Sequence, residues 1–322
     1  MRPRTAGQEW QPKTQEKLLI IHADDMGMSH SANRATIRAF ETGAISSASL
    51  MMPCAWVAEA ADWIKHNPTA DVGLHLTLTS EWSTNRWRPV APVDKVKGLL
   101  DPQGYMWRSV EDVVRRASPQ EVEIEIRAQV ELALQMGLKP THLDSHMGTL
   151  YADARFFEVF LKVGMEYRIP PMVFSPTPEM MLMAAARGLN YREVFQRIEA
   201  AGLPRIDSLN PQYAPGESKE KHRQRLHDYL RTLQPGVNEL IVHLGMDDPE
   251  GNAITDGWRY RVQELEILQE PEFKRVLQEQ QIRLFTYREL AKMYNYGVAF
   301  VRGVPNLSVP LAKRGDPKGG GN

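Results

Sequence analysis

Short apolar runs rich in β-branched residues alternate with longer amphipathic stretches along this chain of 322 residues, and this alternation constrains the fold most strongly. Strands that alternate with helices are typical of α/β proteins with a parallel sheet. Seven such runs favour a closed or nearly closed (β/α) barrel, with a doubly wound open sheet as the alternative. Both folds place their chemistry at the carboxyl ends of the strands. The predicted strands span residues 18–22, 45–51, 72–78, 141–145, 172–174, 240–244 and 282–286.

The stretches between these runs carry signals for helices and their ends. Ser118 and Glu121 form a capping-box pattern, and Pro119 occupies the first helical position between them. This helix is expected to stop at Gly137, where a glycine suits the residue after a helix. Further helices are predicted over residues 29–40, 53–65, 222–233 and 287–293.

One folded unit is predicted over residues 17–300. Residues 1–16 are interpreted as a polar leader, and residues 301–322, which are rich in glycine and proline, as a loose tail. Residues 80–117 show little regular pattern and are expected to pass over the carboxyl ends of the strands. This stretch holds Trp82, Trp87 and Trp107.

Charge and composition exclude several classes of partner. Lys and Arg number 39 against 40 Asp and Glu, so the formal charge of −1 gives no basic surface for nucleic acid or anionic lipid. No segment approaches the roughly 18 apolar residues of a membrane span. We therefore expect a soluble, cytoplasmic protein, with a periplasmic or secreted location as the alternative if a leader has been removed. The single cysteine, Cys54, excludes an intrachain disulfide and a multi-cysteine metal site.

Ionisable residues accompany the apolar strands at four places in the sequence. Buried imidazoles and carboxylates are costly unless they pair with one another or bind a metal ion. Residues two apart in a strand share one face, so the fourth strand presents its ionisable side chains together. The residues are Asp24 and Asp25 after the first strand, His75 in the third, His142, Asp144 and His146 in the fourth, and His243 at the end of the sixth.

Each of these residues also has a plain structural interpretation. One aspartate of the pair would cap the helix that starts near Ser29, and His75 alone would be a core side chain. Four such clusters are harder to explain by packing than one, and an Asp with two His and open positions is typical of a catalytic metal site. Mixed oxygen and nitrogen ligands suit zinc, manganese, iron, cobalt or nickel, whereas magnesium is less natural with imidazole. A solvated role is predicted for His30, His66, His222 and His227.

With these motifs the chain resembles the YdjC/ChbG-like carbohydrate deacetylases over roughly residues 17–290. The matching segments are Ala23-Asp24-Asp25-Met26-Gly27, Gly73-Leu74-His75-Leu76, Pro140-Thr141-His142-Leu143-Asp144-Ser145-His146 and the late His243, in the family's order. The resemblance implies an irregular (β/α) barrel, one divalent metal ion, and hydrolysis of N-acetyl groups on amino sugars such as chito-oligosaccharides.

The resemblance also implies roles for individual residues. Asp25, His75 and His146 would hold the metal ion, for which zinc is favoured and magnesium or another transition metal is the alternative. Asp24 would be the general base and His243 the general acid, and the roles of the two aspartates can be exchanged. Asp144 would orient a ligand imidazole, or else accept hydrogen bonds from loop amides.

The substrate side is less well matched to the family. Met147-Gly148-Thr149 stands where other members continue with histidines, and His22 stands where they often have Asn, so a chitobiose-type substrate is not assumed. Trp82, Trp87 and Arg259 are the candidate substrate contacts, with packing or the start of a helix as their alternative roles. Two other functions stay open: a barrel metallohydrolase for another amide or a phosphate ester, and a non-catalytic carbohydrate-binding protein.

Overall fold

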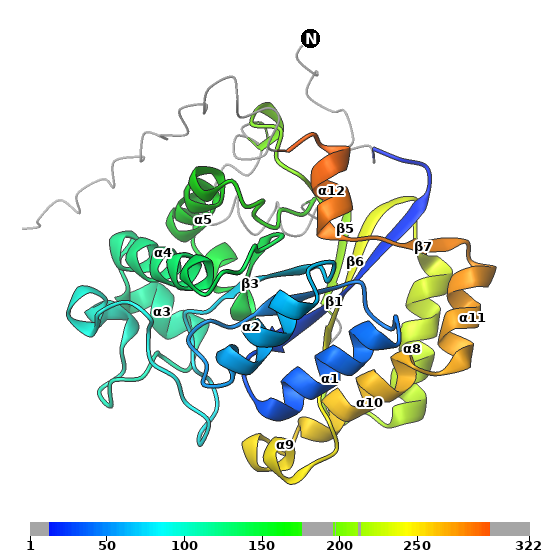
Figure 1. The fold of residues 1–322 in the computed structure, drawn as a ribbon, viewed down its shortest axis with the longest axis horizontal. Helices are drawn as coiled ribbons and strands as arrows, with labels where there is room; N and C mark the ends of the chain where they lie inside the picture. The colour runs from blue at the N-terminus through cyan, green and yellow to red at the C-terminus, as the bar shows by residue number, and fades with distance from the viewer. Residues whose placement is uncertain (1–12, 176–195, 197, 212–213, 297–322) are drawn as a thin grey trace, which may run out of the picture.

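The computed structural model describes residues 13–175, 196, 198–211 and 214–296. Within these residues seven parallel strands form one sheet that curls into a half-barrel with helices around it (Figure 1). The strand order is β4-β3-β2-β1-β6-β5, and β7 also pairs with β1. This arrangement confirms the predicted α/β class. The strands are β1 (Lys17–Met26), β2 (Ser47–Leu50), β3 (Val72–Leu76), β4 (Leu143–Ser145), β5 (Ser208–Pro211), β6 (Gly236–His243) and β7 (Ile282–Leu284).

The long strand β1 organises the sheet because three strands pair with it. Along one edge β6 pairs with β1 from Lys17 to Asp24, and the last pair joins Asp24 to His243. Along the other edge β7 pairs with the start of β1 and β2 with its end. Farther along the sheet, His75 of β3 pairs with Asp144 of β4. The register therefore brings the predicted site residues to neighbouring positions at the carboxyl ends of the strands.

The helices cover the outside of the curled sheet (Figure 1). The capping box is confirmed: Ser118 accepts from the backbone N–H of Glu121, the Glu121 side chain accepts from Ser118, and Gly137 follows in the left-handed region with φ of +80°. The described helices are α1 (His30–Glu41), α2 (Val57–His66), α3 (Val110–Arg116), α4 (Pro119–Gln135), α5 (Ala154–Tyr167), α8 (Lys219–Thr232), α9 (Pro249–Ile254), α10 (Trp258–Leu268), α11 (Pro271–Glu279) and α12 (Tyr287–Met293). Short 3₁₀ turns lie at Val93–Lys95, Lys97–Leu99 and His146–Tyr151.

The predicted strand over residues 172–174 is wrong. This segment makes only isolated parallel bridges, from Pro171 to Leu143 of β4 and from Phe174 to Ile206 just before β5. Consecutive prolines at positions 170 and 171 remove two backbone donors, so a continuous ladder cannot form there. The strand that completes the sheet is β5, which is short, contains Asn and Pro, and was not predicted.

The outer boundaries of the predicted folded unit are only partly described. Most of the predicted leader, residues 1–16, and all of the predicted tail, residues 301–322, lie outside the described residues. No helix in the described part of the chain combines the length and the apolar character that a membrane crossing requires.

Two histidines predicted to be solvated are buried instead. His222 stacks on Tyr260 of α10 with ring centroids 4.3 Å apart, and His227 lies 6.2 Å from the ring of Phe273 in α11. Both belong to α8, whose sequence is mostly polar but which packs against α10 and α11. The prediction failed because it relied on the polar composition of this helix, which does not reveal that one side of the helix packs against other helices.

Candidate metal centre

Asp24 and Asp25 lie at the carboxyl end of β1, and both carboxylates are buried. Asp25 adopts the left-handed backbone region with φ of 67°, and Gly27 follows with φ of 91°. A Cβ at Gly27 would come within 2.9 Å of Leu50 Cδ1, so the turn needs glycine there. Neither aspartate caps the next helix, because Ser29 is the N-cap of α1. The turn therefore leaves both carboxylates directed toward the inside of the half-barrel.

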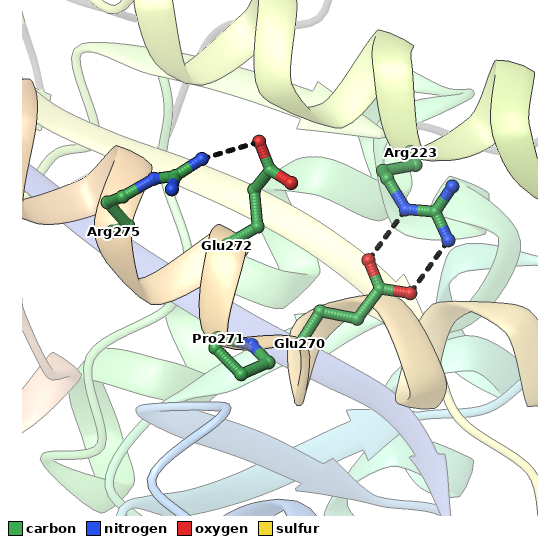
Figure 2. A pocket seen from close by; sticks show the side chains of 5 residues that line it. All are labelled: Arg223, Glu270, Pro271, Glu272 and Arg275. Atoms are coloured by element: carbon green, nitrogen blue, oxygen red, sulfur yellow. Dashed lines mark hydrogen bonds and ion pairs between the residues drawn. The ribbon is translucent and has the colours of Figure 1, made fainter.

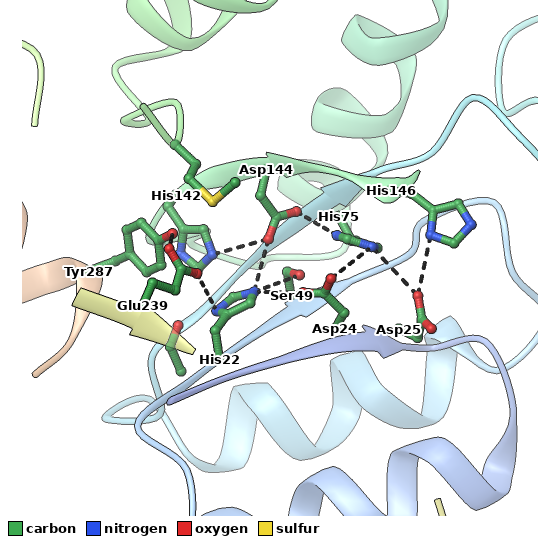
Figure 3. A network of polar contacts seen from close by, with 12 residues as sticks. His22, Asp24, Asp25, Ser49, His75, His142, Asp144, His146, Glu239 and Tyr287 are labelled. Carbon is green, nitrogen blue, oxygen red and sulfur yellow. Dashed lines mark hydrogen bonds and ion pairs between the residues drawn. The ribbon is translucent and has the colours of Figure 1, made fainter. Parts of the chain in front are cut away.

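Asp25, His75 and His146 meet at one point, as the resemblance implies (Figure 3). Asp25 Oδ1 lies 3.5 Å from His75 Nε2 and 3.3 Å from His146 Nδ1. Asp25 Oδ1 is buried and accepts no hydrogen bond of normal geometry from another described residue. Ligand atoms about 2.1 Å from a tetrahedral zinc ion would be about 3.4 Å apart. The spacing and the donor types therefore fit one divalent ion.

Asp144 fixes the orientation of His75. Its Oδ1 lies 2.7 Å from His75 Nδ1, which leaves Nε2 directed at Asp25. Carboxylates commonly hold the second nitrogen of metal-ligating histidines in this way. Burial would raise the pKa of Asp144, but the charge of His75 and hydrogen bonds from His22 and His75 hold it well below its usual range. The sequence placed Asp144 beside a ligand imidazole, and its contact in the structure is with His75 on the neighbouring strand.

Glu81 holds His146 in the corresponding way. His146 Nε2 lies 3.0 Å from Glu81 Oε2, and this contact turns Nδ1 toward Asp25. Burial lowers the pKa of His146, but Glu81 and Asp25 together raise it to about 10. Sequence reasoning missed Glu81, which comes shortly after the strand that carries His75 but lies in a stretch without a regular pattern.

Arg261 of α10 pairs with the other oxygen of Asp25. Its Nη2 lies 2.6 Å from Asp25 Oδ2, and both side chains are buried. Burial would raise the pKa of Asp25, but Arg261 and then His146 hold it well below its usual range. The sequence singled out Arg259 instead, whose side chain is 58% exposed and lies 3.3 Å from Asp247.

Asp24 and His243 lie side by side at the edge of this cluster. Asp24 Oδ2 is 3.8 Å from His243 Nε2 and 3.7 Å from His75 Nε2. The His243 side chain is 21% exposed, so it can reach a molecule bound at the surface. Its backbone N–H donates to the buried Glu264 Oε2 at 2.6 Å, which fixes the end of β6 against α10. A potential base and a potential acid thus flank the three ligand atoms.

The predicted aromatic contacts differ in their surroundings. Trp87 is buried, donates from Nε1 to the Thr79 carbonyl at 2.7 Å, and lies 6.1 Å from the His146 ring. Trp82 is half-buried, and its ring centroid lies 6.0 Å from the Arg261 guanidinium. Trp107 donates to the Gly98 carbonyl at 2.8 Å. Trp87 therefore packs behind a candidate ligand, whereas Trp82 lies beside Arg261, the partner of Asp25.

Met147 directly follows His146 and is exposed. Its side chain is 48% exposed, and its backbone lies in the left-handed region with φ of 52°. Thr79 Oγ1 lies 3.4 Å from its sulfur. The position that differs from the family pattern is therefore an apolar side chain beside the candidate ligands.

A buried polar network continues from Asp144 away from Asp25 (Figure 3). His22 Nε2 lies 2.9 Å from Asp144 Oδ2 and 3.0 Å from Ser49 Oγ. Burial lowers the pKa of His22, but hydrogen bonds to Asp144 and Asp24 raise it well above its usual value. At the far end Tyr287 donates to Glu239 Oε2 at 2.8 Å. Sequence reasoning missed Glu239 and Tyr287 because neither belongs to a recognisable motif.

A surface pocket elsewhere has charged walls that pair with one another (Figure 2). Arg223 of α8 holds both oxygens of Glu270 at 2.6 and 2.8 Å, and Arg275 lies 2.9 Å from Glu272. The paired charges give this pocket no evident chemistry, so the network around Asp25 is the candidate site. The lining residues are Arg223, Glu270, Pro271, Glu272 and Arg275.

Comparisons with known proteins agree on one family. The sequence model of the YdjC-like protein family matches residues 18–279. The chain is 33% identical over 265 residues to a carbohydrate deacetylase of Thermus thermophilus, covering 82% of this chain and 90% of that one. It is 29% identical to a chitooligosaccharide deacetylase of Yersinia enterocolitica, covering 85% and 99% of the two chains. A crystal structure from Enterococcus faecalis, described as a candidate cellobiose-phosphate cleavage protein, has 27% identity, a TM-score of 0.72 and coverage of 85% and 99%.

Proposed function

Since the chain belongs to the YdjC-like family, we propose that it is a metal-dependent hydrolase that removes N-acetyl groups from an amino sugar or oligosaccharide. The observation that carries this proposal is the meeting of Asp25, His75 and His146, with Asp24 and His243 beside them. The names of the relatives in Thermus and Yersinia support an acetylated carbohydrate as the substrate.

The three ligand atoms suit a catalytic metal ion. One carboxylate oxygen and two imidazole nitrogens favour zinc or another transition metal over magnesium. Three protein ligands leave coordination positions for water and substrate, as is typical of catalytic sites. A bound ion of this kind lowers the pKa of water toward about 7 and polarises the carbonyl of the acetyl group.

The remaining steps belong to side chains of this chain. Asp24 accepts the proton of the attacking water, because its Oδ2 lies on the same side as His75 Nε2. His243 donates a proton to the amine nitrogen as it leaves, and its partial exposure brings it to the substrate side. Such a proton transfer is typically worth about 10²- to 10⁴-fold in rate. Arg261 keeps Asp25 ionised and in place through its buried ion pair.

Release of acetate tests the proposal directly. The purified full chain is incubated with a panel of N-acetylated amino sugars and oligosaccharides, after loading with zinc, cobalt, manganese or magnesium. We expect acetate from at least one substrate, and none after the metal is chelated. Hydrolysis of other amides or phosphate esters alone would favour the general metallohydrolase.

The variant Asp24→Asn separates an enzyme from a binding protein. It removes the base and keeps a side chain of nearly the same shape, so turnover should be lost while metal and sugar binding persist. Isothermal titration with the best substrate measures the binding. Sugar binding by the wild type without any acetate release would favour the non-catalytic alternative.

A further inference from the structure

We propose that this chain holds a second divalent cation at an inner site formed by His22 Nε2, His142 Nε2 and Asp144 Oδ2. These atoms lie within 4.8 Å of one another, and the three side chains are buried. The inner site lies on the side of Asp144 away from His146 (Figure 3). It goes beyond the proposed function, which needs only the ion at Asp25, His75 and His146.

The spacing of the inner atoms matches that of the outer ones. Asp144 Oδ2 is 2.9 Å from His22 Nε2 and 3.6 Å from His142 Nε2. Asp24 Oδ1, at 3.3 Å from His22 Nε2, supplies a fourth donor atom near the same point. These distances bracket the value of about 3.4 Å expected between ligands of a tetrahedral zinc ion. The donor set is again imidazole and carboxylate, which suits a transition metal.

The hydrogen bonds of His142 leave a lone pair directed into the inner site. Thr141 Oγ1 donates its proton to the Asp71 carboxylate at 3.1 Å. Thr141 Oγ1 must therefore accept from His142 Nδ1, which lies 3.0 Å away. His142 Nε2 then carries no proton, and it has no hydrogen-bond partner among the described residues although it is fully buried. A bare nitrogen facing a carboxylate oxygen is unfavourable unless a cation lies between them.

Groups outside the inner site hold both imidazoles in place. The ring of Tyr287 stacks on His142 with centroids 3.6 Å apart and an interplanar angle of 13°. Glu239 Oε1 faces His22 Nδ1 at 3.9 Å, and Tyr287 donates to the other oxygen of Glu239. Metal-binding histidines commonly have a carboxylate behind the nitrogen that does not bind the ion. The surroundings of the inner site thus resemble those of the outer one, where Asp144 and Glu81 have that role.

The charges around the two sites also call for more than one cation. Arg261 is the one permanently charged cation that pairs with these carboxylates in the described part of the chain. With all five carboxylates ionised and the imidazoles neutral, Arg261 and one divalent ion would leave a charge of −2, and a second divalent ion would neutralise it. The carboxylates beside the imidazoles are Asp24, Asp25, Glu81, Asp144 and Glu239.

The number of bound ions per chain tests the inference without using activity. The full chain is stripped with a chelator, reloaded with zinc, separated from free metal by gel filtration, and analysed by inductively coupled plasma mass spectrometry. We expect two zinc ions per chain for the wild type. One ion per chain would overturn the inference and would favour a protonated His22 bonded to Asp144 instead.

One variant and one control test whether the second ion binds at the inner site. His22→Asn removes one inner nitrogen, and the count should fall from two to one. The control His227→Asn replaces a buried histidine of α8 outside both sites and should keep two ions. A count of two in His22→Asn would overturn the assignment of the inner site. Circular dichroism spectra of both variants check that they fold. If His22→Asn does not fold, the number of zinc ions bound by the wild type still tests the inference.

The outcome is separable from that of the proposed function. A chain that binds two zinc ions but releases no acetate would keep the inner site and reject the deacetylase. A chain that releases acetate with one ion would keep the deacetylase and reject the inner site.

Discussion

Asp144 and His75 face each other across strands β4 and β3, and Asp144 Oδ1 lies 2.7 Å from His75 Nδ1. The strand register alone creates this contact, because the two residues are paired in the sheet. The contact decides which nitrogen of His75 is available to a metal ion. Asp144 is therefore placed to support the candidate metal centre without being one of its three outer candidate ligands.

Replacing Asp144 with Asn should weaken metal binding. The neutral amide is a weaker acceptor for His75 Nδ1 than the carboxylate, so we expect a loss of about 10- to 100-fold in affinity for the outer ion. Competition with a chromophoric chelator measures the affinity. The exposed Asp247 provides the control, and Asp247→Asn should bind metal as the wild type does. An unchanged affinity in Asp144→Asn would deny Asp144 its positioning role.

Replacing His75 or His146 with Ala should remove the outer ion and with it the turnover. Each variant loses one of three ligands, and the remaining two cannot hold a catalytic ion in place. Metal analysis should show one ion fewer per chain than in the wild type, and acetate release should be undetectable. Full metal content in either variant would show that its histidine is not a ligand.

Replacing His243 with Gln should lower the rate while the metal content stays unchanged. The side chain lies beside Asp24 rather than among the outer ligand atoms, so its loss removes a proton donor and not the ion. We expect turnover to fall by about 10²- to 10⁴-fold. Steady-state kinetics measures the change, and a wild-type rate would exclude His243 as the acid.

Replacing Arg261 with Met should destabilise the metal-free protein. The change leaves the buried Asp25 without its cation, which costs about 3–5 kcal/mol when a buried pair loses one partner. Zinc should restore more stability to this variant than to the wild type, because the ion then compensates Asp25. Urea unfolding with and without zinc measures both effects. The control Arg259→Met breaks an exposed pair and should change the free energy of unfolding by at most about 1 kcal/mol.

Glu125 of α4 should make stability depend on pH. It accepts from the backbone N–H groups of Val90 and Ala91, each at 2.9 Å, and so anchors the segment over residues 80–117. Burial raises the pKa of Glu125 from 4.5 to about 7. Because the pKa is higher in the folded state, its protonation stabilises the fold fully below pH 4.5, and this contribution is lost as pH rises through 7.

The variant Glu125→Gln should lack this dependence. Compared with the variant, the wild type should lose free energy of unfolding between pH 4.5 and 7, with a slope of at most about 1.4 kcal/mol per pH unit. Urea unfolding across this range measures the difference between the two proteins. Parallel profiles would show that Glu125 does not titrate there.

The three candidate metal ligands were accessible to sequence reasoning because they lie on strands or directly after them. Asp25 and His75 each lie one residue before the end of a strand and His146 directly follows one, and the carboxyl ends of parallel strands meet at one edge of the sheet. The capping box at Ser118 was likewise local, since it depends only on neighbouring residues. Features set by short-range pattern or by strand order could thus be predicted.

The supporting residues were not accessible, because they depend on how distant segments pack. Arg261 reaches Asp25 from a helix 236 residues later in the chain, and no local pattern separates it from Arg259. Glu81 lies in an irregular segment, where no period predicts which side chains turn inward. The polar composition of α8 predicted exposure for His222, but the packing of α10 on that helix decides its burial.

Because Met147 has a left-handed backbone, selection for stability and selection for turnover should favour different residues at this position. A bulky residue in this region costs about 1–2 kcal/mol, which glycine would avoid. A library of variants screened only for heat resistance should therefore drift to glycine at position 147, whereas one screened for turnover should keep methionine if the sugar rests on it. Sequencing the variants that survive each screen would test this. Methionine kept only under selection for turnover would indicate that Met147 contacts the sugar, whereas glycine in both pools would indicate that Met147 only lowers the stability of the fold.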